Sequence, residues 1–411
     1  MLSPCETGEE AMIKSNNEGG IGEIFKVFLI LGLTSFGGPV AHLGYFHAEL
    51  VARRKWLGEQ NYADLVALCQ FLPGPASSQV GFALGLHRGG LLGALTAWAA
   101  FTMPSVLLLL IFAYSASSLG GVVGQGIIHG LKLVAVAVVA QAVWGMARHL
   151  CPDIKRVGIA VGAVFVIALL PTALNQIGAI VFGGLLGLWW CRSLPTNAPG
   201  HLGMATSKPA ARFAAFVFFA LLLGLPLLLT LIESQGLALF EGFYRAGALV
   251  FGGGHVVLPL LESSVVESDW ISKDQFLAGY GAAQAVPGPL FSFAAYLGAL
   301  VTLEPNGIIG AAIALVAIFL PGFLLLVGVL PYWDELRKKH KAKAAMAGAN
   351  AAVVGILAAA LYDPVWTSAV LSLLDFVIVL VAFVLLTVWK IAPWKIVLAT
   401  ALAGAGTFVE F

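Results

Sequence analysis

Long apolar stretches recur along the whole chain and leave little room for a water-soluble core. Most of them reach the roughly 20 residues that an α-helix needs to cross the hydrocarbon core of a bilayer. Hydrophobic residues make up 60% of the 411 positions and charged residues only 10%, against about 25% charged residues in a typical soluble domain. The sequence therefore predicts an all-α polytopic membrane protein. The stretches cover residues 24–46, 62–86, 90–116, 124–147, 157–190, 212–232, 239–261, 275–302, 306–330, 344–362, 366–389 and 393–409. The stretch 157–190 is interrupted at Pro171-Thr172 and is predicted to form two short helices.

Charge and motif content exclude several other classes of protein. The formal net charge is +1 and no segment forms a basic face, so we expect no nucleic-acid binding. The chain has no Walker-type phosphate loop, no dinucleotide fingerprint and no Cys-x-x-Cys pair, which argues against an ATP-driven pump and a redox enzyme. Four scattered cysteines suggest no metal site. We therefore expect no cofactor, no metal and no enzymatic activity.

The second half of the chain repeats the motifs of the first half in the same order. The sequence FGGP at 36–39 is answered by FGGGH at 251–255. Trp56 precedes a glutamine and a Pro-Gly-Pro loop at the same spacing as Trp270 does. Chance does not readily reproduce so long a spaced motif, so the sequence predicts two homologous membrane repeats. The predicted parts are a polar cytoplasmic N-terminus without a signal peptide (1–21), a first repeat (22–190), a linker (191–211), a connecting transmembrane helix (212–232) and a second, inverted repeat (233–411).

Loop charges predict that the two repeats have opposite orientations in the membrane. The loop at 47–60 carries Arg53, Arg54 and Lys55, whereas its counterpart at 262–274 is mainly acidic. The uncharged segment 117–125 has a counterpart rich in lysine and arginine at 334–343. Because positive loops stay in the cytoplasm, equivalent loops of the two halves should lie on opposite sides. This pattern indicates an inverted-topology repeat.

All loop charges agree if the segments that carry the Gly/Pro motifs fold as broken or re-entrant hairpins. The chain then has nine full spans and four hairpins, with the N-terminus in the cytoplasm and the C-terminus in the periplasm. Thirteen conventional spans would place the termini on the same sides, and that alternative stays open.

Each Gly/Pro motif can expose the N-terminus of a restarted helix to an anion. Proline removes an N–H and interrupts a helix, and glycine permits left-handed backbone. A helix N-terminus behaves as roughly +0.5 charge, so four that converged would offer about +2, which suits a dianion. The alternative is that the motifs are kinks for helix packing. The predicted substrate-binding residues at the motifs are Ser35, Gly37, Gly38, Pro39, Gln70, Pro73, Gly74, Pro75, Ser77, Ser78, Gly252, Gly253, Gly254, His255, Gln284, Pro287, Gly288, Pro289 and Ser292.

Several titratable side chains are predicted to contact the anion or a coupled proton. Lys132 lies inside an apolar run, where a charge is costly and usually functional, although it could also extend its amine to the interface. His42 and His255 each follow a Gly/Pro break and are, with Lys132, candidates for proton coupling. Arg53, Arg54 and Lys55 could gather anions at the cytoplasmic mouth, or could serve only as the positive-inside signal.

These residues together resemble the chromate ion transporter family, in particular its long two-domain members. The resemblance rests on FGGP at 36–39, RRKW at 53–56, QFLPGP at 70–75, FGGGH at 251–255 and QAVPGP at 284–289, and it covers about residues 22–408. It implies a transporter of the bacterial inner membrane that exports chromate from the cytoplasm, is coupled to the proton motive force and confers chromate resistance. Since GGGH in the second half replaces GGP in the first, two equivalent sites are not expected.

Other functions remain open at this stage. Chromate and sulfate are tetrahedral dianions of similar size, so a site made of helix termini and hydroxyls would separate them poorly. Transport of sulfate or another oxyanion, uptake instead of export, and a passive anion channel are the alternatives. The expected partners are chromate, protons and the lipid bilayer, and a homodimer is left open.

Overall fold

Helices form all the regular structure in the computed structural model, which describes residues 20–116, 121–169, 175–192 and 206–409. No residue in these ranges belongs to a strand, so the predicted all-α class is confirmed. Five helical segments are long and apolar enough to cross a membrane: Ala76–Ser115, Gly121–Leu150, Lys208–Leu229, Gly307–Leu336 and His340–Ala369. Residues 1–19 of the predicted polar N-terminus and the middle of the predicted linker lie outside the described residues.

The helices of the two halves follow one another in corresponding order, with α5 of the first half corresponding to α13 and α14 of the second. The first half consists of α2 (Ile21–Thr34), α3 (Gly38–Phe46), the π-helix η1 (His47–Arg53), α4 (Glu59–Phe71), α5 (Ala76–Ala116), α6 (Gly121–Leu150), α7 (Ile154–Leu169) and α8 (Asn175–Trp190). Helix α9 (Lys208–Leu229) follows. The second half consists of α10 (Gln235–Ala248), η2 (Gly254–Val256), α11 (Val257–Val265), α12 (Lys273–Ala283), η3 (Leu290–Ser292), α13 (Phe293–Leu300), α14 (Gly307–Val329), η4 (Leu330–Tyr332), α15 (Trp333–Leu336), α16 (His340–Ala360), the π-helix η5 (Leu361–Trp366), α17 (Thr367–Ala369), α18 (Leu373–Thr387) and α19 (Pro393–Val409).

A helix ends and another begins at each of the four Gly/Pro motifs. Left-handed glycines make the turns, with φ of 100° at Gly37, 119° at Gly74, 77° at Gly252 and 101° at Gly288. The helices beside the first motif have 14 and 9 residues, and 14 residues extend about 21 Å, which is less than the bilayer core of about 30 Å. The predicted breaks are therefore present, and these helices have the length of half-spans.

Four further helices have fewer than the roughly 20 residues of a full span. Two of them are the short helices predicted for 157–190, α19 has the predicted bounds, and α18 is shorter than the stretch predicted for it. Helices α7 and α8 have 16 residues each, α18 has 15 and α19 has 17. Two helices do replace the long stretch 157–190, as its proline predicts, but the predicted break point at Pro171 lies outside the described residues. Within α5 a second break falls at Gly89 and Gly90, which separates the two apolar stretches predicted there.

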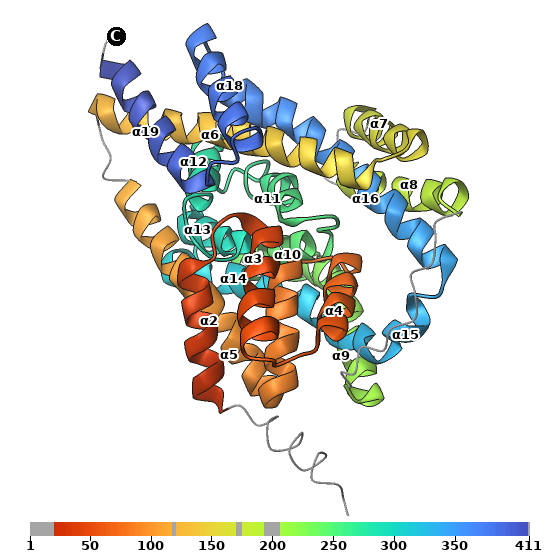
Figure 1. Cartoon of the computed structure of the whole chain (residues 1–411). Helices are drawn as coiled ribbons and strands as arrows, with labels where there is room; N and C mark the ends of the chain where they lie inside the picture. The colour runs from red at the N-terminus through yellow and green to blue at the C-terminus, as the bar shows by residue number, and fades with distance from the viewer. Residues whose placement is uncertain (1–19, 117–120, 170–174, 193–205, 410–411) are drawn as a thin grey trace, which may run out of the picture.

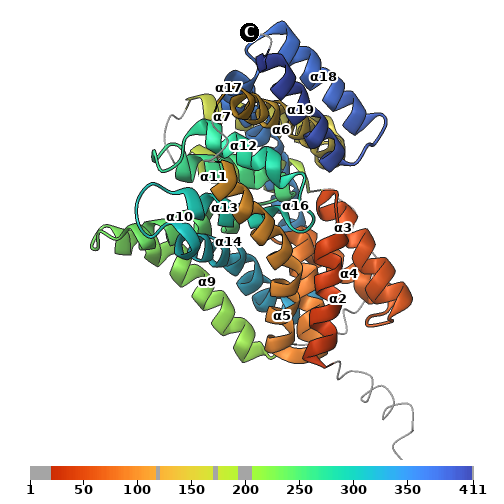
Figure 2. The same cartoon turned by 90° about the vertical axis from the view of Figure 1, so that its left-hand side faces the viewer.

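The last two helices of each half are exchanged, because each pair packs on a helix of the other half. By motif order α6 corresponds to α16, and the pair α7 and α8 corresponds to α18 and α19. Helices α18 and α19 of the second half pack on α6 of the first, whereas α7 and α8 pack on α16 (Figure 1). Helices α2 and α4 lie below α6, α18 and α19 in both views (Figure 2). The turn between α2 and α3 approaches α19, where the ring of Phe36 lies 6.3 Å from that of Trp394.

Small residues allow the exchanged helices to approach closely. Gly126 of α6 lies against Gly404 of α19, and Gly130 lies against Thr400. In the equivalent place Gly348 of α16 lies against Gly183 and Gly187 of α8. Glycine pairs of this spacing are typical of helix contacts in membranes, where close packing replaces the hydrophobic effect.

Candidate functional site

Hydrogen bonds join each Pro-Gly-Pro loop to the Phe-Gly-Gly loop of the other half. The backbone N–H of Gly74 donates to the Val250 carbonyl over 2.7 Å, and the N–H of Gly288 donates to the Ser35 carbonyl over 2.9 Å. The two bonds occupy equivalent positions in the repeat. The third motif also meets the first, because a Cβ added at Gly254 would touch the ring of Pro39. The four motifs therefore gather in the middle of the molecule.

A cavity of about 780 Å³, which we call cavity 1, opens beside three of the four motifs. Motif residues, α6, the end of α18 and the start of α19 form its walls. The lining residues are Phe36, Gly37, Gly38, Pro39, Val40, Tyr45, Val138, Gln141, Trp144, Gly145, Arg148, His149, His255, Ala283, Gln284, Val286, Gly288, Leu290, Leu386, Thr387, Lys390, Ile391, Ala392 and Pro393.

Several helix N-termini face cavity 1. Helix α3 presents its first turn from Gly37 to Val40, and α19 begins at Pro393. The restarted segments after the third and fourth motifs contribute His255 and Leu290. Each N-terminus carries unsatisfied N–H groups and a partial positive charge. The C-terminal ends of α12 and α18 also reach the wall, so the helix dipoles alone do not determine the charge of cavity 1.

Two permanent cations give cavity 1 its charge. Arg148 and Lys390 line it and are exposed to solvent, and the exposed His149 lies beside Arg148. No acidic residue is among the described residues that line it. Arginine and lysine at the rim of a cavity attract anions and raise their local concentration.

Uncharged polar groups are available deeper in cavity 1. The side-chain amide nitrogen of Gln284 is buried and has no hydrogen-bond partner within the described part of the chain. His255 directs Nδ1 to the hydroxyl of Tyr280, 2.7 Å away. Gln141 donates from Nε2 to the Leu386 carbonyl over 3.2 Å. A free amide donor beside helix N-termini fits an oxyanion, which accepts hydrogen bonds and donates none.

Comparison with known proteins assigns the family. A family model described as "Chromate transporter" matches residues 22–188 and matches again at residues 237–405. The chain belongs to the chromate transporter family. One match in each half confirms that the chain contains two homologous repeats, and it is a multi-pass membrane protein.

Relatives named as chromate transporters match most of the chain. A "Probable chromate transport protein" of Synechococcus elongatus is 30% identical over 345 residues, which are 82% of this chain and 83% of the relative. The "Chromate transport protein" of Cupriavidus metallidurans is 31% identical over 397 residues, 93% of this chain and 92% of the relative. That of Pseudomonas aeruginosa is 28% identical over 355 residues, 83% and 80% of the two chains. No solved structure matches the chain.

The second motif of this chromate transporter family member packs tightly and does not line cavity 1. Gly74 and Pro75 lie against Gly322 of α14, and Gln79 donates to the carbonyls of Pro73 and Gly322 over 3.0 and 2.9 Å. Gln70 is exposed on the outside of α4. The first-half glutamine and loop are thus separated from the cavity that their second-half counterparts line.

The predicted serines occupy buried positions behind the motifs. Ser77 lies 3.4 Å from Nδ1 of His42, and Ser292 donates to the Pro289 carbonyl over 2.7 Å. Ser35 and Ser78 are buried, and their hydroxyl oxygens have no hydrogen-bond partner within the described residues. The predicted residues that do not line cavity 1 but stay at the motifs are Ser35, Pro73, Gly74, Pro75, Ser77, Ser78, Gly252, Gly253, Gly254, Pro287, Pro289 and Ser292.

Lys132 lies at a different cavity. Its Nζ donates to Asp274 Oδ1 over 2.9 Å, and both residues line cavity 2, which measures about 470 Å³. Its side chain is 10% exposed. The predicted proton-coupling residues are therefore separated: Lys132 lines cavity 2, His255 lines cavity 1 and His42 is buried against the ring of Phe101.

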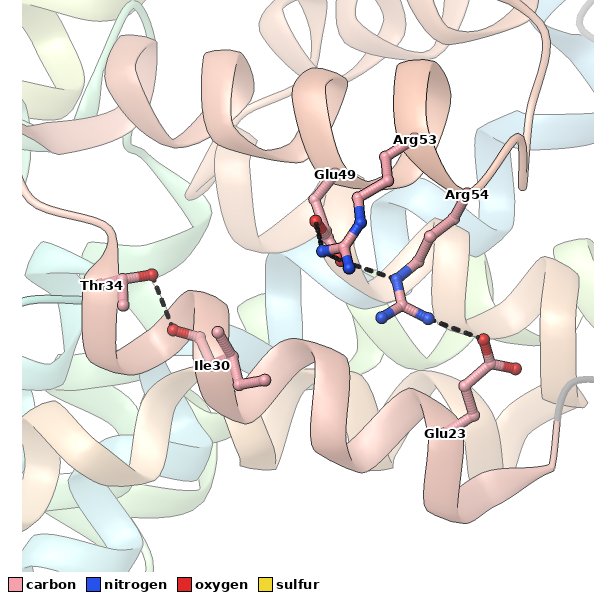
Figure 3. A network of polar contacts seen from close by, with 6 residues as sticks. All are labelled: Glu23, Ile30, Thr34, Glu49, Arg53 and Arg54. Atoms are coloured by element: carbon pink, nitrogen blue, oxygen red, sulfur yellow. Dashed lines mark hydrogen bonds and ion pairs between the residues drawn. The ribbon is translucent and has the colours of Figure 1, made fainter.

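The predicted anion-gathering arginines are paired with carboxylates (Figure 3). Arg53 and Arg54 both bind Glu49, at 2.9 and 2.7 Å, and Arg54 also contacts Glu23 at 2.9 Å. These ion pairs join α2 to η1 and reduce the positive charge available to an anion. Lys55 is exposed, and none of the three cations lines cavity 1.

A third cavity occupies the equivalent place in the other half and has the opposite charge. Cavity 3 measures about 710 Å³ and lies between α11, the end of α16, the end of α7 and the start of α8. Glu262, Glu267 and Asp363 line it together with Lys273. Burial raises the pKa of the Glu267 carboxyl, which lies in the loop after α11. The repeat thus produces one basic and one acidic cavity.

Sequence reasoning missed Gln141, Arg148 and Lys390 as cavity residues. The sequence does show Arg148 and Lys390 as positive charges next to apolar runs. The same pattern is typical of a cytoplasmic loop, so it does not identify a cavity residue. Only the packing of α18 and α19 on α6 brings Arg148 and Lys390 to one cavity.

Proposed function

We propose that the protein exports chromate from the bacterial cytoplasm as a secondary active transporter coupled to the proton motive force, and so confers chromate resistance. The names of the relatives support chromate as the substrate. The observation that carries the proposal is cavity 1, where motifs of both halves meet and where cations and free donors occur with no carboxylate among the described lining residues.

Binding of a dianion follows from the composition of cavity 1. Arg148 and Lys390 attract the anion to the rim, and the amide of Gln284 and the first turn of α3 donate hydrogen bonds inside. Charge-assisted hydrogen bonds of this kind each contribute about 1.5–3 kcal/mol. Together these groups replace the hydration shell of chromate without a metal or a permanently buried cation.

The loop charges support an inverted-topology arrangement with the N-terminus in the cytoplasm and the C-terminus in the periplasm. In that orientation the mouth of cavity 1, with Arg148 and Lys390, faces the cytoplasm. Cavity 3, with Glu262, Glu267 and Asp363, faces outward. Chromate would be collected on the basic side and released toward an acidic side that repels it, which favours export.

Flux measurement tests this function and its alternatives. Inside-out vesicles that contain the protein should accumulate chromate against its gradient when a proton gradient is imposed, and excess sulfate should compete because both anions are tetrahedral dianions. Chromate equilibration without uphill accumulation would indicate a passive channel. Absence of chromate flux from folded protein, with uptake of sulfate instead, would contradict the proposal.

A further inference from the structure

A buried histidine–aspartate pair between the two halves lies at cavity 2, away from the anion cavity. His129 of α6 places Nε2 2.6 Å from Asp375 Oδ1 of α18, and the two side chains are 8% and 10% exposed. His129 also lines cavity 2. Ionisable groups buried within a bilayer are costly, and chains of Asp, Glu and His residues there commonly carry protons.

The surroundings of Asp375 hold its carboxylate in one orientation. Its Oδ2 accepts hydrogen bonds from the backbone N–H groups of Leu371 and Ser372, over 3.0 and 2.9 Å. Ser372 caps α18 in return, over 3.1 Å. A carboxylate fixed in this way orients the imidazole of His129 through its contact with Nε2, so the ring keeps one position at cavity 2.

Other titratable groups face His129 from each side of cavity 2. Lys132 lies one turn further along α6 and is paired with Asp274 of α12. Tyr296 of α13 also lines the cavity. Helix α19, which packs on the same part of α6, presents Gly404 and Thr400 there. With His129 neutral, the formal charges of Lys132, His129 and their two aspartate partners sum to about −1. One added proton therefore balances the charge.

The same two helices connect the buried pair to cavity 1. Helix α18 pairs through Asp375 at its start, and its end contributes Leu386 and Thr387 to cavity 1. There Gln141 of α6 donates to the Leu386 carbonyl. A change of charge at His129 therefore acts on a helix pair that also forms part of the anion cavity.

We propose that cavity 2 is the proton-loading site of the transporter, and that His129, held by Asp375, carries the proton exchanged for the anion. The proton adds to a ring nitrogen of the neutral imidazole and leaves the ring again after the conformational change. This assignment rests on the proposed function, and it places proton coupling at a residue pair distinct from His42, His255 and Lys132.

Two flux assays in reconstituted vesicles separate coupling from substrate transport. One measures uphill chromate accumulation driven by a proton gradient, and the other measures exchange of labelled for unlabelled chromate without a gradient. His129→Gln should reduce driven accumulation by about tenfold or more and flatten its pH profile, while exchange stays within about threefold of wild type. The matched control His47→Gln, at an exposed histidine paired with Glu59, should leave both assays unchanged.

Three outcomes would overturn the assignment. They are intact driven accumulation in His129→Gln, an unchanged pH profile in that variant, and loss of exchange together with accumulation in folded protein. If His129→Gln does not fold, the double variant His129→Gln/Asp375→Asn keeps a neutral hydrogen bond between the halves and is predicted to give the same uncoupled exchange. Wild-type protein that moves no chromate in either assay would instead contradict the proposed function itself.

Discussion

The backbone N–H of Gly74 in the first half donates a hydrogen bond to the carbonyl of Val250 in the second, 2.7 Å away. Its repeat equivalent joins Gly288 to Ser35. Together with the exchanged packing of α7, α8, α18 and α19, these bonds intertwine the halves. Movement of one sequence half against the other would break them, so we expect alternating access to involve mixed units such as α6 with α18 and α19.

Substitution of Gly288 by alanine should destabilise the contact between the halves that its hydrogen bond to Ser35 forms. Gly288 has φ of 101°, and a Cβ there would lie 2.9 Å from Ser105 Oγ. Left-handed backbone costs a non-glycine residue about 1–2 kcal/mol, so we expect a lower thermal unfolding temperature of the purified protein. Gly44→Ala is the control, because Gly44 is helical and has nothing within 4 Å of an added Cβ. Equal stability of Gly288→Ala and Gly44→Ala would contradict the contact between the halves at Gly288.

Substitution of Gly130 by valine should separate α6 from α19. A Cβ at Gly130 would collide with the backbone of Thr400, and overpacking of this kind typically costs about 1–3 kcal/mol. The expected result is a smaller folded fraction in size-exclusion chromatography. Gly224→Val on α9, where an added Cβ meets nothing within 4 Å, should behave as wild type. A well-folded Gly130→Val protein would show that these helices do not pack as described.

Removal of the two rim cations should weaken capture of the anion without preventing transport. In Arg148→Gln/Lys390→Gln, we expect the chromate concentration for half-maximal flux to rise about threefold to tenfold, since exposed charges contribute modestly. The difference should shrink in high salt, which screens exposed charges. Lys155→Gln/Arg156→Gln removes equal charge outside cavity 1 and should have little effect. The same rise in both double variants would indicate a general surface effect.

Replacement of Lys132 by alanine should strongly reduce transport while the protein stays inserted. The change leaves Asp274 without its partner at cavity 2 and adds an uncompensated negative charge beside His129, which disturbs proton loading there. We expect about a tenfold or greater loss of flux, and partial recovery in Lys132→Ala/Asp274→Asn. Normal flux in the single variant would remove Lys132 from the transport route, and no recovery in the double variant would mean that it does more than neutralise Asp274.

The sequence predicted the repeat and the helix breaks because glycine, proline and spaced motifs act locally. It also marked Gln284 and His255, which line cavity 1. It could not predict that the equivalent Gln70 is exposed, because that difference depends on which helices of the other half cover each motif. The pairing of Lys132 with Asp274 and of His129 with Asp375 likewise joins residues of different halves, which only the tertiary packing brings together.

Chromate binding to the purified protein tests most directly that cavity 1 holds the substrate. Gln284→Leu removes the free amide donor from the cavity, and Gln70→Leu makes the same change at the exposed repeat equivalent. We predict that chromate binds the wild-type protein saturably and that sulfate competes for the site. Gln284→Leu should bind chromate at least about tenfold more weakly, and Gln70→Leu should bind it as wild type does. Unchanged affinity in Gln284→Leu, or an equal loss in Gln70→Leu, would contradict the placement of the substrate in cavity 1.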